Sequence, residues 1–460
     1  MRPRNQIARE RLEAVLSRQA PISAPDLAQA LEISTATLRR VLDEQPGDIL
    51  AAGNARRRRY ALRRSLRGDA RPLPLYAIDR EGRATEAGNL SLIRPQGTHL
   101  TLDPKVWPTP EESRDGWWDG LPYPLQDMRP QGYMGRHFAR THSEKLQLNP
   151  DPQKWSDDDA LVAISREGHD LTGNLVLGEA AITQWQARHA TQADPLRSNQ
   201  TGPRYTKLAE EALATGTAGS SAAGEFPKFT ALRELAGATT PHVIVKFSGV
   251  ESSSTVERWS DLLVCEHLAL EALRGLNGIE VATSRIVRHA GRTFMESERF
   301  DRHGLQGRSP LVSLMSLDTS FIGAGTADWV TLAARLASLG LLTPEQVQQI
   351  SCLGWFGRLI ANTDMHNGNL SFRPQGVLTL APAYDMLPMM YAPLPGGELP
   401  RRDFAPAAPR PEQRTPWFAA LTAALVFWRS AASDTRISIG FRSICTDNTE
   451  RLNDLASRVH

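Results

Sequence analysis

The sequence predicts an α+β protein in which a β-rich segment is followed by a helical segment, with a small basic module in front. Residues 215–320 contain alternating, β-branched runs that are typical of strands. From about residue 326 the spacing is mainly helical, broken by a loop-rich stretch at 361–410. Residues 1–71 carry fifteen arginines and eight acidic residues, a net charge of +7 in a chain of +2. We therefore expect a two-lobed catalytic unit behind a module that meets an anionic partner.

Length and composition narrow the class of protein. The chain has 460 residues, of which 41% are hydrophobic and 23% charged, as in an ordinary globular protein. The longest apolar run, Trp417–Trp428, is shorter than the roughly 20 residues that a membrane span needs. The first 20 residues lack the apolar segment of a secretory signal. The three cysteines lie far apart and form no CxxC pair, so we expect a cytoplasmic protein without a membrane partner.

The pattern divides the chain into four expected domains. They are a basic module, a β-rich subdomain, a lobe with a phosphate loop and a lysine strand, and a helical lobe, over residues 1–68, 69–210, 211–325 and 326–460. The polar stretch 190–207 is interpreted as a linker or flexible loop.

The basic module shows helical spacing followed by a hairpin pattern. We expect helices over 5–19, 24–31 and 35–44 and two strands over 48–62. This is the layout of a winged helix-turn-helix, whose second paired helix enters the major groove of DNA while the wing meets phosphate. The candidate DNA contacts are Thr35, Thr37, Arg39, Arg40, Arg56, Arg57, Arg58 and Arg59. A plain helical bundle with a solvated arginine run is the alternative.

The most informative run, Ala361-Asn-Thr-Asp-Met-His-Asn-Gly-Asn369, follows an amphipathic helix predicted over 344–360. Asp364 suits the carboxylate that accepts a hydroxyl proton in phosphoryl transfer, and Asn369 and Asp385 suit the oxygen ligands of Mg²⁺. We group His366 with Asp364 as candidate catalytic residues, although it could be a core histidine that donates to a carbonyl group. A D-x4-N spacing alone is weak evidence, because turns also use these residues.

The upstream strand predicted over 241–249 strengthens this interpretation. Alternation places Lys246 on the face opposite Val243, Val245 and Phe247. A buried ammonium needs an anion, which in a kinase is nucleotide phosphate together with an acid on the next helix. That helix offers two acids, Asp261 and Glu266, and the sequence does not choose between them. An edge-strand lysine that reaches solvent is the alternative.

Two further segments complete the candidate nucleotide site. The run of small residues before the lysine strand would let backbone N–H groups approach phosphate, although it matches no standard phosphate-loop motif. Its candidate contacts are Gly219, Ser220, Ser221 and Lys228. After the lysine strand, Glu298-Arg-Phe-Asp-Arg302 is a plausible link between lobes, where backbone groups could pair with adenine and Phe300 could pack on the ring.

Taken in order, these segments resemble the HipA family of serine/threonine kinases, the toxins of type II toxin–antitoxin pairs. The resemblance rests on Asn362-Thr-Asp-Met-His-Asn-Gly-Asn369 and Glu298-Arg-Phe-Asp-Arg302, and the N-terminal module makes the chain most similar to the YjjJ branch. It implies a bilobal protein-kinase-like fold, ATP and Mg²⁺ as cofactors, and the roles given above. Glu298 and Phe300 would cradle adenine, and the loop 217–228 would cover the phosphates.

The resemblance also implies partners. HipA members phosphorylate an aminoacyl-tRNA synthetase and are restrained by a DNA-binding antitoxin. Residues 310–325 differ from the family's acidic-Gln segment, so the protein substrate can differ. Gly216 stands about where HipA carries its self-inactivating serine, so the resemblance does not extend to self-phosphorylation at that place.

We therefore expect an ATP- and Mg²⁺-dependent serine/threonine kinase that inhibits growth and carries a fused DNA-binding module. Two other functions stay open. One is a DNA-binding regulator on a kinase-like body that has lost catalysis. The other is a nuclease with a metal held by Asp364, His366 and Asp385.

Overall fold

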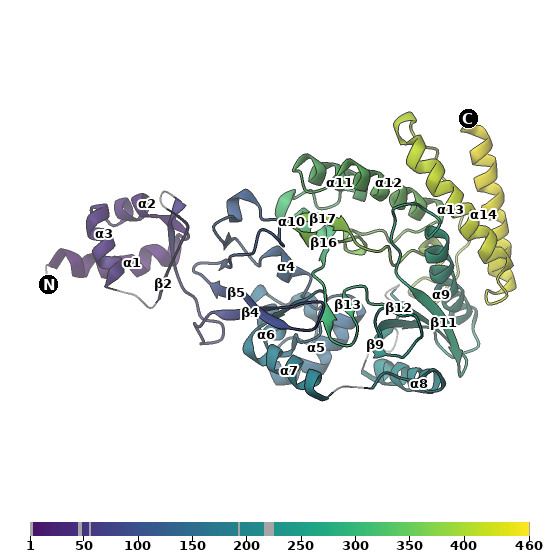
Figure 1. Ribbon diagram of the computed structural model, residues 1–460, viewed down its shortest axis with the longest axis horizontal. Coiled ribbons are helices and arrows are strands. Elements are labelled where there is room, and N and C mark those ends of the chain that lie inside the picture. Colours follow the sequence, from purple (N-terminus) through teal and green to yellow (C-terminus); the bar gives the residue numbers. More distant parts are fainter. Residues whose placement is uncertain (1–2, 45–47, 55–56, 192–193, 216–224, 460) are drawn as a thin grey trace.

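The N-terminal module combines three helices with a three-stranded sheet (Figure 1). The structure is a computed structural model that describes residues 3–44, 48–54, 57–191, 194–215 and 225–459. The elements of the module are α1 (Pro3–Arg18), β1 (Ile22–Ser23), α2 (Ala24–Ala30), α3 (Thr35–Asp43), β2 (Ile49–Ala52) and β3 (Arg59–Leu62). The sequence predicts the helices and the β2–β3 hairpin, but not β1, which pairs with β3 and gives the order β1-β3-β2.

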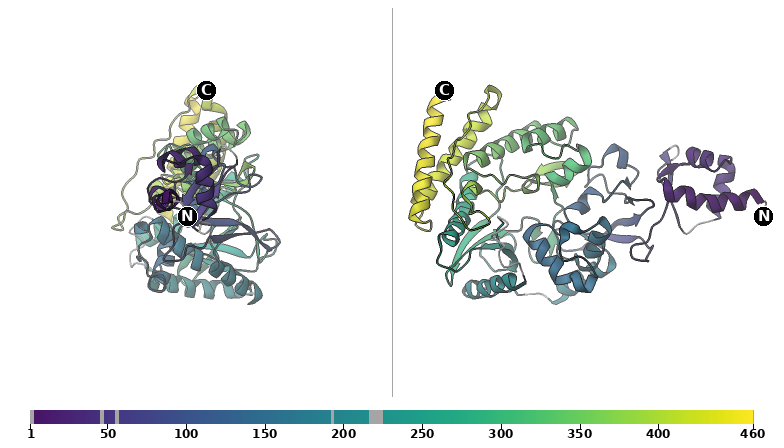
Figure 2. Two further views of the ribbon diagram at one scale, coloured as in Figure 1. Left: turned by 90° about the vertical axis from the view of Figure 1, so that its left-hand side faces the viewer. Right: turned by 180° about the vertical axis from the view of Figure 1, so that it is seen from behind.

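The module has its own core and contacts the body near β3. Leu12, Leu16, Leu27, Leu38 and Val41 pack together and are almost fully buried. The chain leaving β3 pairs with the body, because the Arg64 amide donates to the Leu92 carbonyl at 2.8 Å and the Arg94 amide donates to the Leu62 carbonyl at 2.9 Å. The module therefore projects from one end of the body, as Figures 1 and 2 show.

The next region, from β4 to α7, surrounds a five-stranded sheet of order β7-β6-β5-β4-β8. The strands are β4 (Leu73–Ile78), β5 (Ala84–Leu92), β6 (Thr98–His99), β7 (Trp117–Trp118) and β8 (Leu175–Leu177). The helices are α4 (Tyr123–Gln126), α5 (Gly132–Leu146), α6 (Asp157–Glu167) and α7 (Glu179–Thr191). Leu75, Leu90 and Leu161 join the main hydrophobic core of the body.

A four-stranded antiparallel sheet follows, in the order β11-β12-β10-β9. Its elements are α8 (Ser198–Thr215), β9 (Lys228–Leu232), β10 (His242–Phe247), α9 (Ser254–Leu273), β11 (Ser284–His289) and β12 (Arg292–Glu298). Tyr205 and Ala209 of α8 pack on Val243, Val245 and Phe247, which confirms the predicted alternation of β10.

The helix α8 corrects the interpretation of 190–207 as a linker, because residues 198–207 are helical. The sequence does not predict this helix, because the segment is polar and contains Pro203. The boundary predicted between residues 210 and 211 falls inside α8, and the packing places this helix with the sheet.

The remaining chain is mainly helical. Short strands come first: β13 (Arg302–His303), β14 (Gly307–Arg308) and β15 (Val312–Ser313). The strand β15 pairs with β16 (Ser371–Gln375), which pairs in turn with β17 (Val377–Leu380). The helices are α10 (Leu314–Phe321), α11 (Trp329–Ser338), α12 (Pro344–Leu359), α13 (Arg414–Ser433) and α14 (Ile439–Arg458). The helix α13 packs against α12, α14 and α9, so it joins the helical part to the four-stranded sheet.

Across the described ranges, no helix combines the length and the apolar character that crossing a membrane requires.

Candidate active site

Lys246 on β10 lies between two carboxylates that come from different parts of the chain. Its ammonium donates to both carboxylate oxygens of Glu266 on α9 at 2.7 Å, and it also donates to Asp385 in the loop after β17. Glu266 is only 2% exposed and Lys246 8%. The four-stranded sheet and the helical part therefore meet at this ion cluster.

The structure resolves which acid of α9 faces the lysine. The carboxylate of Asp261 accepts hydrogen bonds from the Ser438 amide at 2.7 Å and the Ser438 hydroxyl at 2.6 Å, so it holds the start of α14. Glu266 therefore pairs with Lys246, and Asp261 has a structural contact elsewhere.

The loop 362–369 brings the other predicted residues to the same place. The Asn362 side-chain amide donates to the Asp385 carbonyl at 3.4 Å, and the Asn362 oxygen accepts the Asp364 amide at 3.0 Å. The Asn369 side-chain amide donates to the Asp364 carbonyl at 2.9 Å. These bonds link Asp364, Asn369 and Asp385 through one hydrogen-bonded loop, although they lie up to 21 residues apart in the sequence.

Tyr384 fixes the loop that presents Asp385. Its hydroxyl donates to the Gly368 carbonyl at 2.7 Å and lies 2.8 Å from the Ser371 hydroxyl. Asp385 itself has φ 57°, a left-handed backbone conformation that an aspartate tolerates better than bulkier residues do. Such conformations are concentrated at functional sites.

Charge within the cluster governs the protonation of its members. Burial opposes the ionisation of Asp385, but the Lys246 ammonium and, next in effect, Lys228 hold the pKa of Asp385 below its ordinary value. Burial also opposes the ammonium of Lys246, yet Asp385 and Glu266 raise the pKa of Lys246. Lys246 is therefore charged and Asp385 ionised at neutral pH.

Asp364 has the opposite tendency. Partial burial raises the pKa of its carboxyl group. His366 opposes this rise, whereas the nearby carboxylates of Asp385 and Glu225 add to it. The residue is solvent-exposed, so a hydroxyl group can reach it, and a raised pKa makes it a better proton acceptor than an ordinary aspartate.

Comparison with known proteins identifies the family. A model described as "HipA-like C-terminal domain" matches residues 220–433, and one described as "YjjJ-like toxin, middle domain" matches residues 69–186. Toxin YjjJ of Escherichia coli (strain K12) is 37% identical over 445 residues, which is 96% of this chain and 97% of that protein. The chain belongs to the YjjJ branch of the HipA toxin family.

The fold agrees with this membership of the HipA family. A chain of the solved complex of HipA, HipB and operator DNA from Shewanella oneidensis MR-1 matches with a TM-score of 0.50 and 16% sequence identity. The match covers 84% of this chain and 97% of that chain. At this identity the likeness shows the fold alone.

The ion cluster of this HipA-family chain has the chemistry to hold Mg²⁺ and nucleotide phosphate. The Asn369 amide nitrogen is bonded to the Asp364 carbonyl, which turns the amide oxygen, a ligand that hard cations prefer, to the other side. Asp385 adds an ionised carboxylate. Glu266 and Asp385 both face Lys246, so a cation that approaches Asp385 meets carboxylate oxygen. Asn369 and Asp385 therefore fit a metal ion, and Lys246 offers a positive charge to phosphate.

The phosphate-loop candidates are only partly described. Gly219, Ser220 and Ser221 lie outside the described residues. Lys228 is directly opposite Lys246 in the β9–β10 register, so both lysines are on the same sheet face. Lys228 lies 3.4 Å from the Glu225 carboxylate, which also accepts the Tyr133 amide at the start of α5 at 2.8 Å. Sequence reasoning missed Glu225, because nothing local marks its partner 92 residues upstream.

The two candidate adenine contacts lie at the end of β12. The Glu298 carboxylate accepts Arg233 Nη2 at 2.8 Å and is 6% exposed, so its side chain is occupied by an ion pair. Phe300 is half-buried, with its ring centroid 5.6 Å from that of Tyr384. Phe300 therefore lies beside Tyr384, the neighbour of Asp385 in the ion cluster. Any contact of Glu298 with a nucleotide would use the backbone of Glu298.

His366 has a hydrogen-bonding partner within its own turn. Its Nδ1 accepts the Gly368 amide at 3.1 Å, and its carbonyl accepts the Asn369 amide at 2.9 Å. The imidazole thereby caps the turn that positions Asn369. His366 is exposed, so it is not the core histidine that the sequence left as an alternative.

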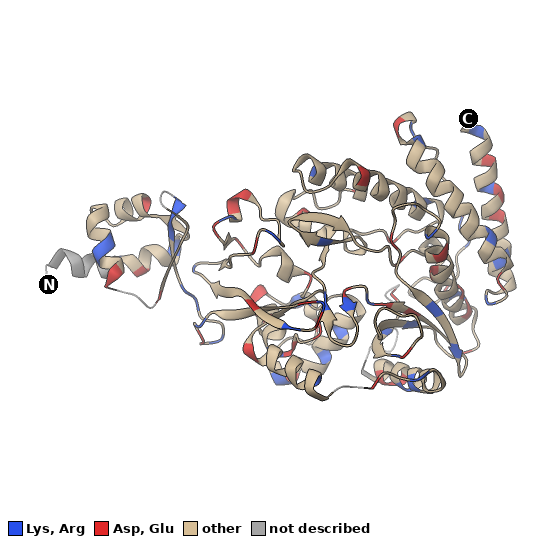
Figure 3. Cartoon of the chain, viewed as in Figure 1, with Lys and Arg blue, Asp and Glu red and all other residues tan. Residues whose placement is uncertain are grey.

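Most of the candidate DNA contacts are exposed on the N-terminal module. Thr35, Arg39 and Arg40 are exposed on α3, whereas the Thr37 hydroxyl lies 2.9 Å from the Ser34 hydroxyl at the helix start. Arg57, Arg58 and Arg59 are exposed before and within β3, and Arg56 lies outside the described residues. Figure 3 shows basic residues on the hairpin of this module.

Proposed function

We propose that the protein is an ATP- and Mg²⁺-dependent serine/threonine protein kinase of HipA type that inhibits growth. One observation carries the proposal: Lys246 is paired with Glu266 on the following helix and lies against Asp385 beside the Asp364 loop. A strand lysine, a helix glutamate and a metal-binding aspartate are the parts that orient a nucleotide triphosphate in protein kinases.

The roles follow from the geometry. Asp364 accepts the proton of the attacking hydroxyl, because it is exposed and has a raised pKa. Asn369 and Asp385 supply oxygen ligands, and bound Mg²⁺ would neutralise charge that develops on the phosphates. Lys246 contacts phosphate while Glu266 holds it in place. His366 positions the turn that carries Asn369.

Around this centre, the sheet lobe and the helical lobe enclose the nucleotide. The segment 217–228 would cover the phosphates with Gly219, Ser220, Ser221 and Lys228. The backbone near Glu298 and the ring of Phe300 would contact adenine. The phosphorylated protein stays a prediction from resemblance, for which an aminoacyl-tRNA synthetase is the family example.

The geometry does not favour a metal-dependent nuclease. His366 Nδ1 accepts the Gly368 amide, so this nitrogen is not free to bind a metal ion. Within the described part of the chain, no group of three or more His, Cys, Asp and Glu side chains is arranged to hold a metal ion. A phosphoryl-transfer site needs fewer protein ligands, because the nucleotide supplies the rest.

The experiment for catalysis is a radiolabelled-ATP assay with purified protein and cell extract. We expect a labelled protein band that depends on Mg²⁺ and is absent with Asp364→Ala. Calorimetry with Mg-ATP distinguishes the kinase from a DNA-binding regulator that has lost catalysis. Such a regulator would give neither a labelled band nor heat of ATP binding. Full activity in Asp364→Ala would refute the assignment of the base.

We also propose that residues 1–68 form a winged helix-turn-helix that binds DNA. The support is the order of helices and hairpin, together with exposed arginines on α3 and before β3. The Shewanella relative was solved with HipB and operator DNA, so a DNA-binding antitoxin is a candidate partner here.

A triple substitution tests the DNA proposal in the full chain. Arg57, Arg58 and Arg59 are changed to Gln, and Arg401 and Arg402, exposed in the body, are changed in the control. Each lost phosphate contact should reduce the slope of log K against log salt by about 0.9. An unchanged slope in the triple variant would contradict the wing assignment.

A further inference from the structure

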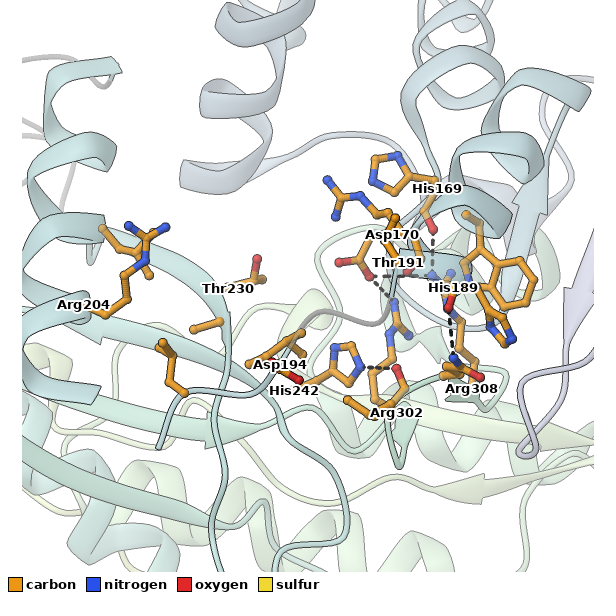
Figure 4. Close-up of a pocket in the computed structure, with 18 residues that line it drawn as sticks. His169, Asp170, His189, Thr191, Asp194, Arg204, Thr230, His242, Arg302 and Arg308 are labelled. Carbon is orange, nitrogen blue, oxygen red and sulfur yellow. Dashed lines mark hydrogen bonds and ion pairs between the residues drawn. The ribbon is translucent and has the colours of Figure 1, made fainter. Parts of the chain in front are cut away.

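A cavity of about 430 Å³ lies beside the edge strand β9 (Figure 4). Its walls come from α7, α8, β9 and the β13–β14 hairpin, together with His169 and Asp170. Neither Lys246 nor the loop 362–369 lines it. The volume is within the roughly 300–1,000 Å³ of small-molecule sites.

Positive charge exceeds negative charge at the base of this cavity. Asp170 accepts Arg302 Nη2 at 2.9 Å and Arg299 Nη1 at 3.0 Å, and Asp301 is bonded to the same two arginines. Arg308 adds a third buried guanidinium, 3.8 Å from Asp170. Three cations therefore face two carboxylates, and Figure 4 shows Asp170, Arg302 and Arg308 converging.

Arg308 holds the unbalanced charge. It is 5% exposed, its best polar contact is with the His169 carbonyl at 2.7 Å, and its Nη1 is buried without a hydrogen-bond partner among the described residues. The Nε atom of Arg302 is in the same state. Burial and the neighbouring Arg302 lower the pKa of Arg308 to about 9. A buried cation without a counter-charge lowers the stability of the folded protein. A bound anion would supply the missing negative charge.

The cavity is also lined by two further arginines, Arg188 and Arg204, and by one further acid, Asp194. Arg188, in the last turn of α7, is exposed; its carbonyl accepts the Thr191 hydroxyl at 3.2 Å, and its guanidinium has no ion pair among the residues that the structure describes. Burial and, next in effect, the positive charge of Arg188 lower the pKa of His169 at the cavity wall. Apolar side chains form other parts of the wall, among them Trp185 and Leu305.

We propose that this cavity binds a small phosphorylated molecule, whose phosphate meets the arginines and whose apolar body lies against Trp185. The planar guanidinium matches phosphate in a bidentate manner, and the cavity is too small for a folded partner. The site goes beyond the proposed kinase activity. It joins the region matched as the YjjJ-like middle domain to the sheet that carries Lys246, so its ligand would brace the two parts.

Calorimetry on the full-length protein with phenyl phosphate tests the proposal, and inorganic phosphate is the second probe. We expect phenyl phosphate to bind more tightly than inorganic phosphate, since only the former reaches Trp185. Arg188→Glu should weaken phenyl phosphate binding by about tenfold or more, because it replaces attraction at the rim with repulsion. Arg335→Glu is the matched control, an exposed arginine in the last turn of α11.

Three outcomes would overturn the proposal. They are the absence of heat with either probe at millimolar concentration, binding by Arg188→Glu within twofold of the unaltered protein, and displacement of phenyl phosphate by saturating Mg-ATP. Equal affinity for the two probes would refute the apolar part of the site. Because phenyl phosphate binding does not require ATP turnover, failure of the kinase proposal would leave this result intact.

Discussion

The protein contains two buried ion clusters that differ in the proportion of basic to acidic side chains in direct contact. Around Lys246, one ammonium faces the carboxylates of Glu266 and Asp385. Around Asp170, three guanidinium groups face two carboxylates. The first group suits an added cation and the second an added anion, since unbalanced buried charge is unfavourable. The sign of the imbalance therefore indicates the class of ligand at each place.

The largest expected effect concerns the group around Lys246. Asp385→Asn leaves the Lys246–Glu266 pair balanced but removes the carboxylate offered to the metal. We expect ATP turnover to fall by about a thousandfold, since a group that stabilises transition-state charge is lost. The melting temperature should also fall, because ionised Asp385 is paired with Lys246, but too little to account for the loss of turnover.

Turnover assays and thermal melting measure these two effects separately. Asp403→Asn, which alters an exposed aspartate paired with Arg451, is the control. Retention of normal turnover by Asp385→Asn would show that the first group is structural.

The next effect concerns stability at the second group. Asp170→Asn leaves Arg299, Arg302 and Arg308 with Asp301 alone, so we expect a loss of about 2–3 kcal/mol, a value reduced because Asp170 is 29% exposed. Arg308→Met removes the unbalanced cation and should cost about 1 kcal/mol or less. Urea unfolding of the two variants measures the contrast. A larger loss in Arg308→Met would mean that its bond to the His169 carbonyl outweighs its charge.

A smaller effect is expected from the helix glutamate. Glu266→Gln keeps the shape of the side chain and one acceptor oxygen but removes its charge. Asp385 is then the carboxylate that pairs with Lys246, which draws the ammonium toward it and misplaces both for nucleotide binding. Turnover should fall by up to about a hundredfold, the scale of an ångström of misplacement.

Asp261→Asn is the matched control for Glu266→Gln, because it neutralises a buried acid of the same helix that bonds Ser438. It should lower stability and spare turnover per folded molecule. Equal loss of turnover in both variants would refute the pairing argument.

The sequence could predict the first group but not the second. Alternation along β10 placed Lys246 opposite the face that α8 covers, and the polar loop after α12 marked Asp364 and Asn369. The choice of Glu266 required the orientation of α9. The second group is assembled from residues some 130 positions apart, joined to Asp170 only by the fold. The helix α8 was missed because packing against β10, not local pattern, stabilises it.

The smallest effect is a shift in the dependence of turnover on pH, and it tests whether Asp364 is the base. Asp364 has a pKa above the ordinary 3.8, so turnover should rise with pH through a midpoint above that value. Asp385 has a lowered pKa, so its contribution to stability is complete above 3.8 and is lost only as pH falls through the lowered value. Activity should therefore disappear before the fold does.

Glu225→Gln sharpens the test, because it removes one carboxylate that raises the pKa of Asp364. The acid limb of the profile should then move to lower pH, by less than about one unit for one neighbouring charge across a solvent-exposed site. Profiles of kcat/KM for both proteins, with circular dichroism at each pH, measure the shift. A limb that moves to higher pH, or that coincides with unfolding, would assign the acid limb to a group other than Asp364.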